Sequence, residues 1–301
     1  MRNVGNARRH VVSVLQSLRR AGVCQSTTAP WRFDEDVRHY SFAGWTAIGV
    51  WLQKLADDSI ASIRFPAPLP SRERVRAAVN MLRTAGLSVS HLVGSGFYTE
   101  PDDEARRRSV DHTVSAIRVA DSLAARCLVV VPGRLNGLSR GRALDLSAAA
   151  ITVALERSDG STVSLAIEPV KEVDFVTTLD DALDLADLVD HDRVGVLPDS
   201  FHVLRDPSSP EAIERAAGRI LAVHLADAAG DGTWTRLPPG EGRLALADFV
   251  ARIEATGYRG TYDVEMISTS ATSEDAHDLL KRCSNGIHCI VGPAVGHTRS
   301  D

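Results

Sequence analysis

The chain has 301 residues, of which 44% are hydrophobic and 24% are charged, and its formal net charge is −5. This composition is that of an ordinary globular protein, and the negative charge excludes a bulk attraction to nucleic acid or anionic membranes. No apolar run approaches the roughly 18 residues of a membrane-spanning helix, and the four cysteines form no Cys-x-x-Cys pair. We therefore expect a cytoplasmic protein with no disulfide framework and no membrane or nucleic-acid partner.

The first 20 residues are basic and carry apolar side chains at near-helical spacing: Val11, Val12, Val14, Leu15 and Leu18. This spacing predicts an amphipathic helix that lies on the outside of the main domain. A targeting peptide is the alternative interpretation, but the segment lacks a continuous apolar core.

Short apolar runs alternate with helical segments from residue 21 to residue 283. Strands are predicted at 21–29, 45–51, 87–93, 127–131, 163–167, 193–196, 220–223 and 260–264. Helices are predicted at 34–43, 71–86, 102–126, 143–157, 180–189, 210–219, 247–256 and 273–283. The alternation predicts an α/β protein with a single (β/α)8 TIM barrel over 21–283. Residues 1–20 would be a helical extension, and 284–301 a flexible tail.

The third predicted strand ends in Gly94-Ser95-Gly96, a Gly-x-Gly pattern that invites comparison with phosphate-binding loops. The third glycine and the lysine of such loops are missing. We interpret these residues as a turn that leaves space above a pocket.

Four consecutive predicted strands end on a residue that can bind a metal: Glu168, Asp199, His224 and Glu265. Sites of β/α barrels lie at the carboxyl ends of the strands, so these side chains are expected to converge. Three carboxylates and one imidazole suit Mn²⁺, Mg²⁺ or Co²⁺, and Zn²⁺ also accepts them. A single strand-end carboxylate is as often salt-bridged to a loop, but four in succession favour a site for one divalent ion.

Other residues are candidates for contact with a substrate. His202 follows Asp199 by three residues and is placed to donate a hydrogen bond to a substrate oxygen rather than to bind the metal. Trp31 and Trp51 follow strand ends, where they line either a pocket or the core at the barrel rim. No role is assigned to the remaining histidines, His91 among them.

Five short motifs resemble those of the xylose isomerase-like barrels: Ala166-Ile167-Glu168-Pro169, Leu197-Pro198-Asp199-Ser200-Phe201-His202, Val223-His224-Leu225-Ala226-Asp227, Pro239-Gly240-Glu241-Gly242 and Val264-Glu265. Within that family they look most like the sugar (phosphate) isomerase/epimerase branch, which includes 2-keto-myo-inositol isomerases and ketose 3-epimerases. The resemblance implies a metal bound by the four strand-end residues, with Glu168 and Glu265 also serving as the acid/base pair.

The chain departs from the pattern of ketose epimerases at three places. No glutamate stands near the end of the second strand, Asp174 replaces a second glutamate, and Gly230 replaces an arginine. We therefore expect Lys171, Arg134 or Arg236 to supply substrate contacts instead.

The resemblance implies a metal-dependent isomerase or epimerase of a small keto-sugar, polyol or inosose, acting by proton abstraction next to a carbonyl through an enediolate. We expect small-molecule substrates as its partners, and a homodimer is one assembly that the protein could form. A lyase on the same barrel is a close alternative, of the inosose or dehydroshikimate dehydratase type or cleaving C-glycosides, because the same proton abstraction can lead to loss of a β-substituent. An apurinic-site endonuclease would need extra metal ligands on the earlier strands, and a non-catalytic binding protein would not need four intact ligands.

Overall fold

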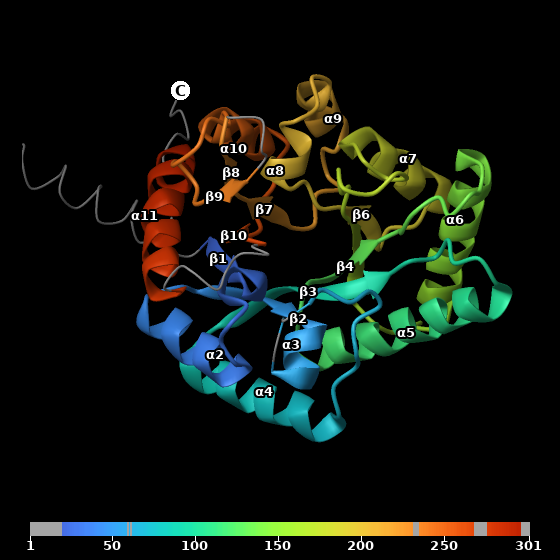
Figure 1. The fold of residues 1–301 in the computed structure, drawn as a ribbon, viewed down its shortest axis with the longest axis horizontal. Coiled ribbons are helices and arrows are strands. Elements are labelled where there is room, and N and C mark those ends of the chain that lie inside the picture. Colours follow the sequence, from blue (N-terminus) through green and yellow to red (C-terminus); the bar gives the residue numbers. More distant parts are fainter. Residues whose placement is uncertain (1–19, 59, 61, 231–234, 268–275, 296–301) are drawn as a thin grey trace, which may run out of the picture.

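The computed structural model describes residues 20–58, 60, 62–230, 235–267 and 276–295. Its strands form one parallel sheet in the order β6-β5-β4-β3-β2-β1-β10-β7, with helices around it (Figure 1). The strands are β1 (Ala21–Cys24), β2 (Ala47–Trp51), β3 (Ser88–Gly96), β4 (Cys127–Val131), β5 (Ser164–Ile167), β6 (Val194–Val196), β7 (Val223–Leu225) and β10 (Tyr262–Val264). Parallel bridges join Val196 to Ile220 and Asp199 to His224, so the two ends of the sheet meet. The predicted eight-stranded barrel is confirmed.

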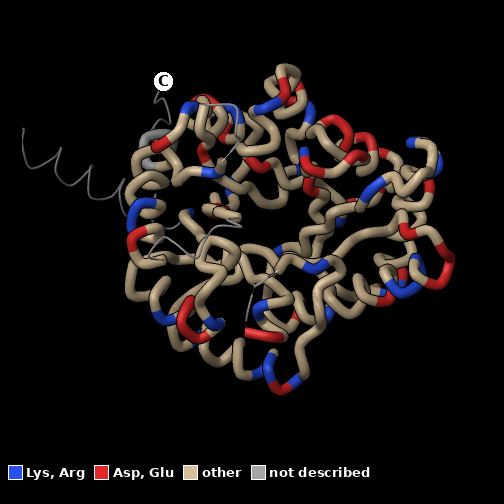
Figure 2. Tube along the Cα trace, viewed as in Figure 1, with Lys and Arg blue, Asp and Glu red and all other residues tan. Residues whose placement is uncertain are grey.

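Helices cover the outside of the sheet. They are α2 (Phe33–Phe42), α3 (Leu52–Asp57), α4 (Arg72–Ala85), α5 (Asp103–Ser122), α6 (Arg140–Glu156), α7 (Leu179–Val189), α8 (Ser200–Val203), α9 (Ser209–Arg215), α10 (Leu246–Ala255) and α11 (Ala276–Val295). Helix α4 has regular caps: the Ser71 side chain accepts a hydrogen bond from Arg74 N, and Gly86, with a φ of +70°, ends the helix. Charges of both signs are spread along these outer helices (Figure 2). Among the described helices, none has the length and hydropathy needed to cross a bilayer.

Apolar side chains form two separate clusters. The larger cluster lies between the sheet and the helices, and the smaller one joins residues at inward positions of the strands or next to them. Members of the smaller cluster are Cys24, Trp51, Val93, Cys127, Val129, Ala166, Leu197 and Ala222. Side chains therefore fill the barrel below its upper rim, as in other β/α barrels.

Helix α11 corrects the predicted C-terminal tail. The helix was expected to end at 283, but it continues through Val295, so 284–295 are helical rather than flexible. Ile287 and Val291 extend the apolar stripe of the helix and are buried. Gly286 lies where a Cβ would be 1.8 Å from the backbone oxygen of Pro239, so this position of the helix needs a glycine. The predicted helix within residues 1–20 lies outside the described residues, apart from Arg20.

Several strand boundaries differ from the prediction. β3 continues to Gly96, so the Gly-x-Gly segment belongs to a strand with a register shift between Val93 and Ser95 instead of a turn. β7 begins at Val223, which places His224 inside the strand. β1 ends at Cys24 rather than at residue 29, because Gln25–Thr28 form a 3-10 turn, η1.

A buried lysine holds this turn in place. Lys54 Nζ donates hydrogen bonds to the backbone oxygens of Gln25 and Thr28, at 3.2 and 2.7 Å. It also forms an ion pair of 2.7 Å with Asp36, and both side chains are completely buried. Burial raises the pKa of Asp36 to about 7, although Lys54 opposes the rise. This pair joins α2 and α3 to the first strand.

Replacing Lys54 should destabilise the fold, because its buried partners would remain without a cation. We expect Lys54→Met to lower the free energy of unfolding by about 3–5 kcal/mol, because Asp36 and two backbone oxygens lose their partner. Urea denaturation measures the change. Lys281→Met, at an exposed position on α11, is the matched control and should leave the midpoint unchanged; equal midpoints for the two variants would contradict the structural role.

Candidate metal and substrate site

Four polar side chains converge at the carboxyl ends of neighbouring strands. Glu168 follows β5, Asp199 follows β6, His224 lies in β7 and Glu265 follows β10. One ligand atom from each lies within 4.8 Å of the others, and all four residues are buried. The structure thus brings together the four residues that the sequence analysis selected.

Hydrogen bonds and charge link the four residues. His224 Nδ1 lies 3.2 Å from Glu168 Oε1 and 3.3 Å from Glu265 Oε2. Burial, supported by the neighbouring carboxylates, raises the pKa of Glu168 to about 7. Burial acts in the same direction on Glu265, but the charge and hydrogen bond of His224 outweigh it and hold the pKa of Glu265 below its usual value. The two glutamates therefore differ in their affinity for a proton.

Asp199 tests whether this set of donors fits a metal ion. Its Oδ1 accepts a hydrogen bond of 2.9 Å from Phe201 N and so caps the short helix α8. Its Oδ2 is buried without a hydrogen bond, which is uncommon for a carboxylate oxygen. Asp199 contributes one carboxylate oxygen to the cluster of donor atoms, and three carboxylates with one imidazole are ligands that a divalent cation accepts. The residues present fit such an ion.

Arg236 brings a second cation to the same group. It lies on the hairpin of β8 (Asp227–Ala228) and β9 (Arg236–Leu237). Its Nη2 is 2.8 Å from Asp199 Oδ2, as an ion pair without hydrogen-bond alignment, and its Nη1 donates to the backbone oxygen of Glu265 at 3.0 Å. The guanidinium also lies over the ring of Phe201, 4.4 Å from the centroid. Arg236 therefore offsets part of the negative charge of the site.

The Pro-Gly-Glu-Gly motif supports this hairpin rather than lining the site. Asp227 Oδ2 accepts a hydrogen bond of 3.1 Å from Gly240 N, and its Oδ1 accepts one of 2.9 Å from Leu244 N. A Cβ on Gly242 would lie 2.3 Å from Asp227 Oδ1, so glycine is required there. The motif thereby holds the segment after β9 against Asp227 of β8, and so stabilises the hairpin that carries Arg236.

His202 lies on helix α8 with both ring nitrogens engaged. Nε2 accepts a hydrogen bond of 3.1 Å from Arg236 Nη2, while Nδ1 lies 3.3 Å from Glu172 Oε2. Burial lowers the pKa of His202 to about 4, despite the nearby Asp199, so the ring is neutral at pH 7. Its nitrogens are 3.8 Å or more from Asp199 Oδ2. His202 therefore lies beside the four-residue cluster and orients Arg236.

His91 was missed by the sequence analysis, although it stands in the middle of a predicted strand. It is completely buried inside the barrel, and its Nε2 lies 3.0 Å from His224 Nε2. Gly49 on β2 makes room for it, since a Cβ there would be 2.4 Å from His91 Cε1. The sequence did offer one signal for His91: an ionisable residue in the middle of a predicted strand of an otherwise buried sheet.

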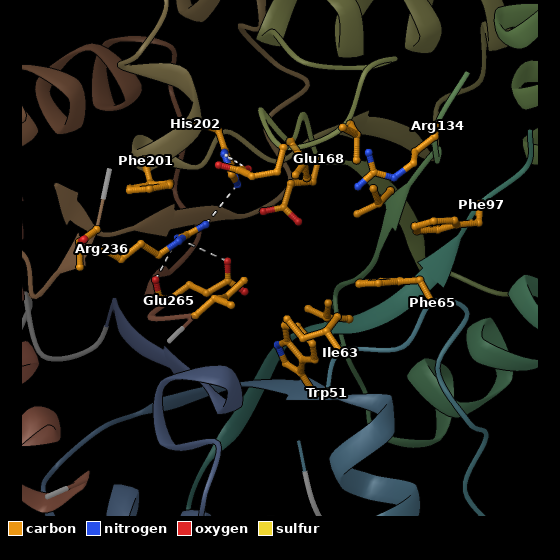
Figure 3. Close-up of a pocket in the computed structure, with 17 residues that line it drawn as sticks. Trp51, Ile63, Phe65, Phe97, Arg134, Glu168, Phe201, His202, Arg236 and Glu265 are labelled. Atoms are coloured by element: carbon orange, nitrogen blue, oxygen red, sulfur yellow. Dashed lines mark hydrogen bonds and ion pairs between the residues drawn. The ribbon is translucent and has the colours of Figure 1, made fainter. Parts of the chain in front are cut away.

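A pocket of about 630 Å³ opens above these residues (Figure 3). Trp51, Arg134, His202 and Arg236 line it, as do Glu168 and Glu265. Trp31 does not, because its ring packs on His39 and His277 between α2 and α11. Lys171 is also absent from the lining, and its ammonium pairs with Asp206 at 3.3 Å. Trp31 was expected to line either a pocket or the core at the rim, and Lys171 was one of three candidates for substrate contact; neither belongs to the pocket lining.

Curated relatives of the chain act on small cyclic or sugar-like molecules. It is 23% identical to the inosose isomerase of Bacillus velezensis over 203 residues, which are 65% of this chain and 72% of that protein. It is 25% identical to an L-ribulose-5-phosphate 3-epimerase of Shigella flexneri, over 71% of this chain and 76% of the relative. It is 36% identical to a 3-dehydroshikimate dehydratase of Pseudomonas putida over 118 residues, 35% of this chain, and spans only 19% of that longer protein.

Solved structures and a family model cover most of the chain. A protein from Sinorhizobium meliloti 1021 is 28% identical and superposes with a TM-score of 0.76, over 91% of this chain and 98% of its own. The IOLI protein, solved with a zinc atom, has a TM-score of 0.78 at 18% identity over the same shares. The model that describes the xylose isomerase-like TIM barrel matches residues 41–283. The chain belongs to this family of xylose isomerase-like TIM barrels.

Proposed function

We propose that the protein is a divalent-metal-dependent isomerase or epimerase of a small keto-sugar, polyol or inosose. The observation that carries the proposal is the convergence of Glu168, Asp199, His224 and Glu265 within 4.8 Å at the mouth of the barrel. The names of the inosose isomerase and epimerase relatives support the substrate class.

The four residues would hold the ion. When bound, a divalent ion polarises a carbonyl group and favours loss of a proton from the neighbouring carbon. Proton transfer itself falls to Glu168 and Glu265, which come from opposite sides of the ligand group on β5 and β10. The raised pKa of Glu168, about 7, suits a group that transfers protons near neutral pH. The pKa of Glu265 is held low, so Glu265 stays ionised and Glu168 is the stronger base of the pair.

Arg236 would orient the substrate beside the carboxylates, and His202 would hold Arg236 in place. Both side chains line the pocket, and Arg236 donates to His202 Nε2 across the 3.1 Å contact. A guanidinium fixed in this way acts without reorganisation when negative charge develops on a substrate oxygen. Because both ring nitrogens of His202 are engaged, its part in the reaction would pass through Arg236.

A dehydratase is the second candidate. It is favoured by the 36% identity to a 3-dehydroshikimate dehydratase, the highest among the three curated relatives described above. Proton abstraction next to a carbonyl is common to both reactions, so the fate of the carbanion separates them.

Deuterated water distinguishes the two reactions. Protein loaded with Mn²⁺ and incubated with keto-inositols, ketopentose phosphates or dehydroshikimate should yield an isomer that carries one solvent deuterium, observed by NMR. Loss of water from the substrate would indicate the dehydratase instead.

Variants test the metal dependence. Glu265→Gln and Asp199→Asn should lose bound metal and turnover together, whereas Glu104→Gln, exposed on α5, should retain both. Full turnover after removal of metal with a chelator would refute the proposal.

His202→Ala should separate metal binding from substrate orientation. We expect the variant to keep stoichiometric metal, because the ring lies beside the ligand group, and to lose on the order of 100-fold in kcat/KM, about 2.7 kcal/mol. Metal content and kinetics are measured on one preparation. His191→Ala, at an exposed position, is the control. Loss of metal would make His202 a ligand, and unchanged kinetics would leave it without a part in the reaction.

A further inference from the structure

The pocket has two chemically different sides. Most of its ionisable side chains follow β5, β6 or β10 or lie in β9. The opposite wall, on and next to β2, β3 and β4, is apolar apart from Arg134 at its edge, and its apolar members are Trp51, Ile63, Phe65, Val93, Phe97 and Val131. Figure 3 shows Phe65, Phe97, Ile63 and Trp51 grouped on one side, facing Glu168, Glu265 and Arg236.

The apolar wall offers no hydrogen bond to a ligand from its side chains. The indole N–H of Trp51, its one polar group, already donates to Cys24 Sγ at 2.9 Å. An unsubstituted polyol carries hydroxyl groups around its whole ring. Any hydroxyl group that pointed at this wall would lose its hydrogen bonds to water and gain none from the protein. The wall therefore disfavours a substrate that is polar on all sides.

Its aromatic rings are held in a defined arrangement. Phe65 and Phe97 are stacked with centroids 5.4 Å apart and an interplanar angle of 14°, and Trp51 meets Phe65 edge-on. Phe97 has a φ of +62°, a conformation that is rare for a bulky residue. It is kept there by the hydrogen bond from its N–H to Val131 O at 2.8 Å. Such backbone strain often marks a binding site.

Among the residues that the structure describes, the wall is also incompletely covered. Ile63 is 42% exposed, and Phe65 and Phe97 are half-buried although they line a pocket of about 630 Å³. This volume lies in the range of pockets that enclose drug-sized ligands. There is thus room for a second group attached to the part of the substrate that reacts.

We propose that the substrate is amphipathic: a keto-polyol part at the carboxylates joined to a flat aryl group that packs on Phe65, Phe97 and Trp51. The inference rests on the proposed function for the location of the keto-polyol part. It extends that function by assigning the opposite wall to an apolar substituent.

Equilibrium binding to the Mn²⁺-loaded protein tests this without turnover. Calorimetry compares two matched pairs of probes, methyl with phenyl β-glucoside and myo-inositol with its mono-O-benzyl ether. We expect the aryl member of at least one pair to bind about 10-fold more tightly or better. Wild-type protein that binds neither aryl probe more tightly than its partner overturns the proposal.

Variants of the aromatic residues test whether the wall causes the preference for the aryl probes. Phe65→Ala and Phe97→Ala should each remove most of the preference for the aryl probe, whereas Phe42→Ala, 91% exposed on α2, should retain it. Phe65→Leu, which keeps the apolar volume but not the flat ring, guards against loss of fold and should show an intermediate preference. A preference that survives both alanine variants overturns the proposal. Failure of metal-dependent proton exchange, by contrast, would refute the isomerase and leave the measured aryl preference intact.

A separate observation concerns His91 beneath the carboxylates. Ser90 Oγ donates to Asp263 Oδ1 at 2.7 Å, and His91 Nδ1 lies 3.0 Å from Ser90 Oγ. If His91 Nδ1–H donates to this oxygen, His91 Nε2 is left as an acceptor for His224 Nε2–H, at 3.0 Å. In this tautomer His224 Nδ1 has a lone pair for an ion bound between it and the glutamates, whereas without an ion Nδ1 carries the proton that it shares with them.

The geometry points to His91 as a positioning residue that fixes the tautomer and ring orientation of His224 for metal binding. Hydrogen bonds to the second nitrogen of a ligating histidine commonly have this effect, and their loss costs about 10- to 100-fold in metal affinity. Here a buried histidine, backed by Ser90 and Asp263, supplies the acceptor.

Affinity for Co²⁺ alone, by competition with a chelator, tests this assignment. His91→Leu removes the acceptor and should weaken Co²⁺ binding 10- to 100-fold. His91→Gln keeps an acceptor at similar reach and should stay within about threefold of wild type. Equal affinities for the leucine and wild-type proteins, or equal losses in both variants, overturn the assignment. Wild-type protein without Co²⁺ affinity would refute the metal site itself.

Discussion

The site depends on burying three carboxylates within a few ångströms of one another. Such a group is unstable unless positive charge or protons compensate it. The barrel meets this demand with His224 between two glutamates and with Arg236 against Asp199. A divalent ion would add the remaining charge. Much of the surrounding structure serves this balance: Asp227 and the glycines of the Pro-Gly-Glu-Gly motif hold the hairpin of Arg236, and α8 places His202 against it.

The barrel and the convergence of the four strand-end residues could be predicted from the sequence because they follow from local patterns. Short apolar runs define parallel strands, and the carboxyl ends of such strands meet on one face. The ion pairs of Lys54 and Arg236 and the contact of His91 with His224 could not be predicted, since each joins segments far apart in the chain. Trp31 and Lys171 also follow strands, but their side chains found partners on helices and loops instead. The extension of α11 past Cys283 could not be predicted either, because Gly286 is needed there for a close contact with Pro239, which lies far away in the chain.

Chemistry and selectivity are separated in the barrel. The residues suited to proton transfer and metal binding follow β5, β6 and β10 or lie in β7, whereas the apolar wall comes from β2 to β4 and their loops. Changes in the second half would alter the reaction, and changes in the first would alter the molecules admitted. A family whose relatives are named for isomerisation, epimerisation and dehydration is consistent with such a division.

The pairing of β1 with β10 has a consequence for biosynthesis. The first strand of the barrel finds one of its two neighbours only in β10, the last strand of the sheet along the chain. Because chains emerge from the ribosome amino end first, the sheet stays open, with an unpaired edge on β1, until β10 has been synthesised. Glu265 arrives with the same strand. The four converging side chains therefore come together only when the barrel closes, late in the synthesis of this domain.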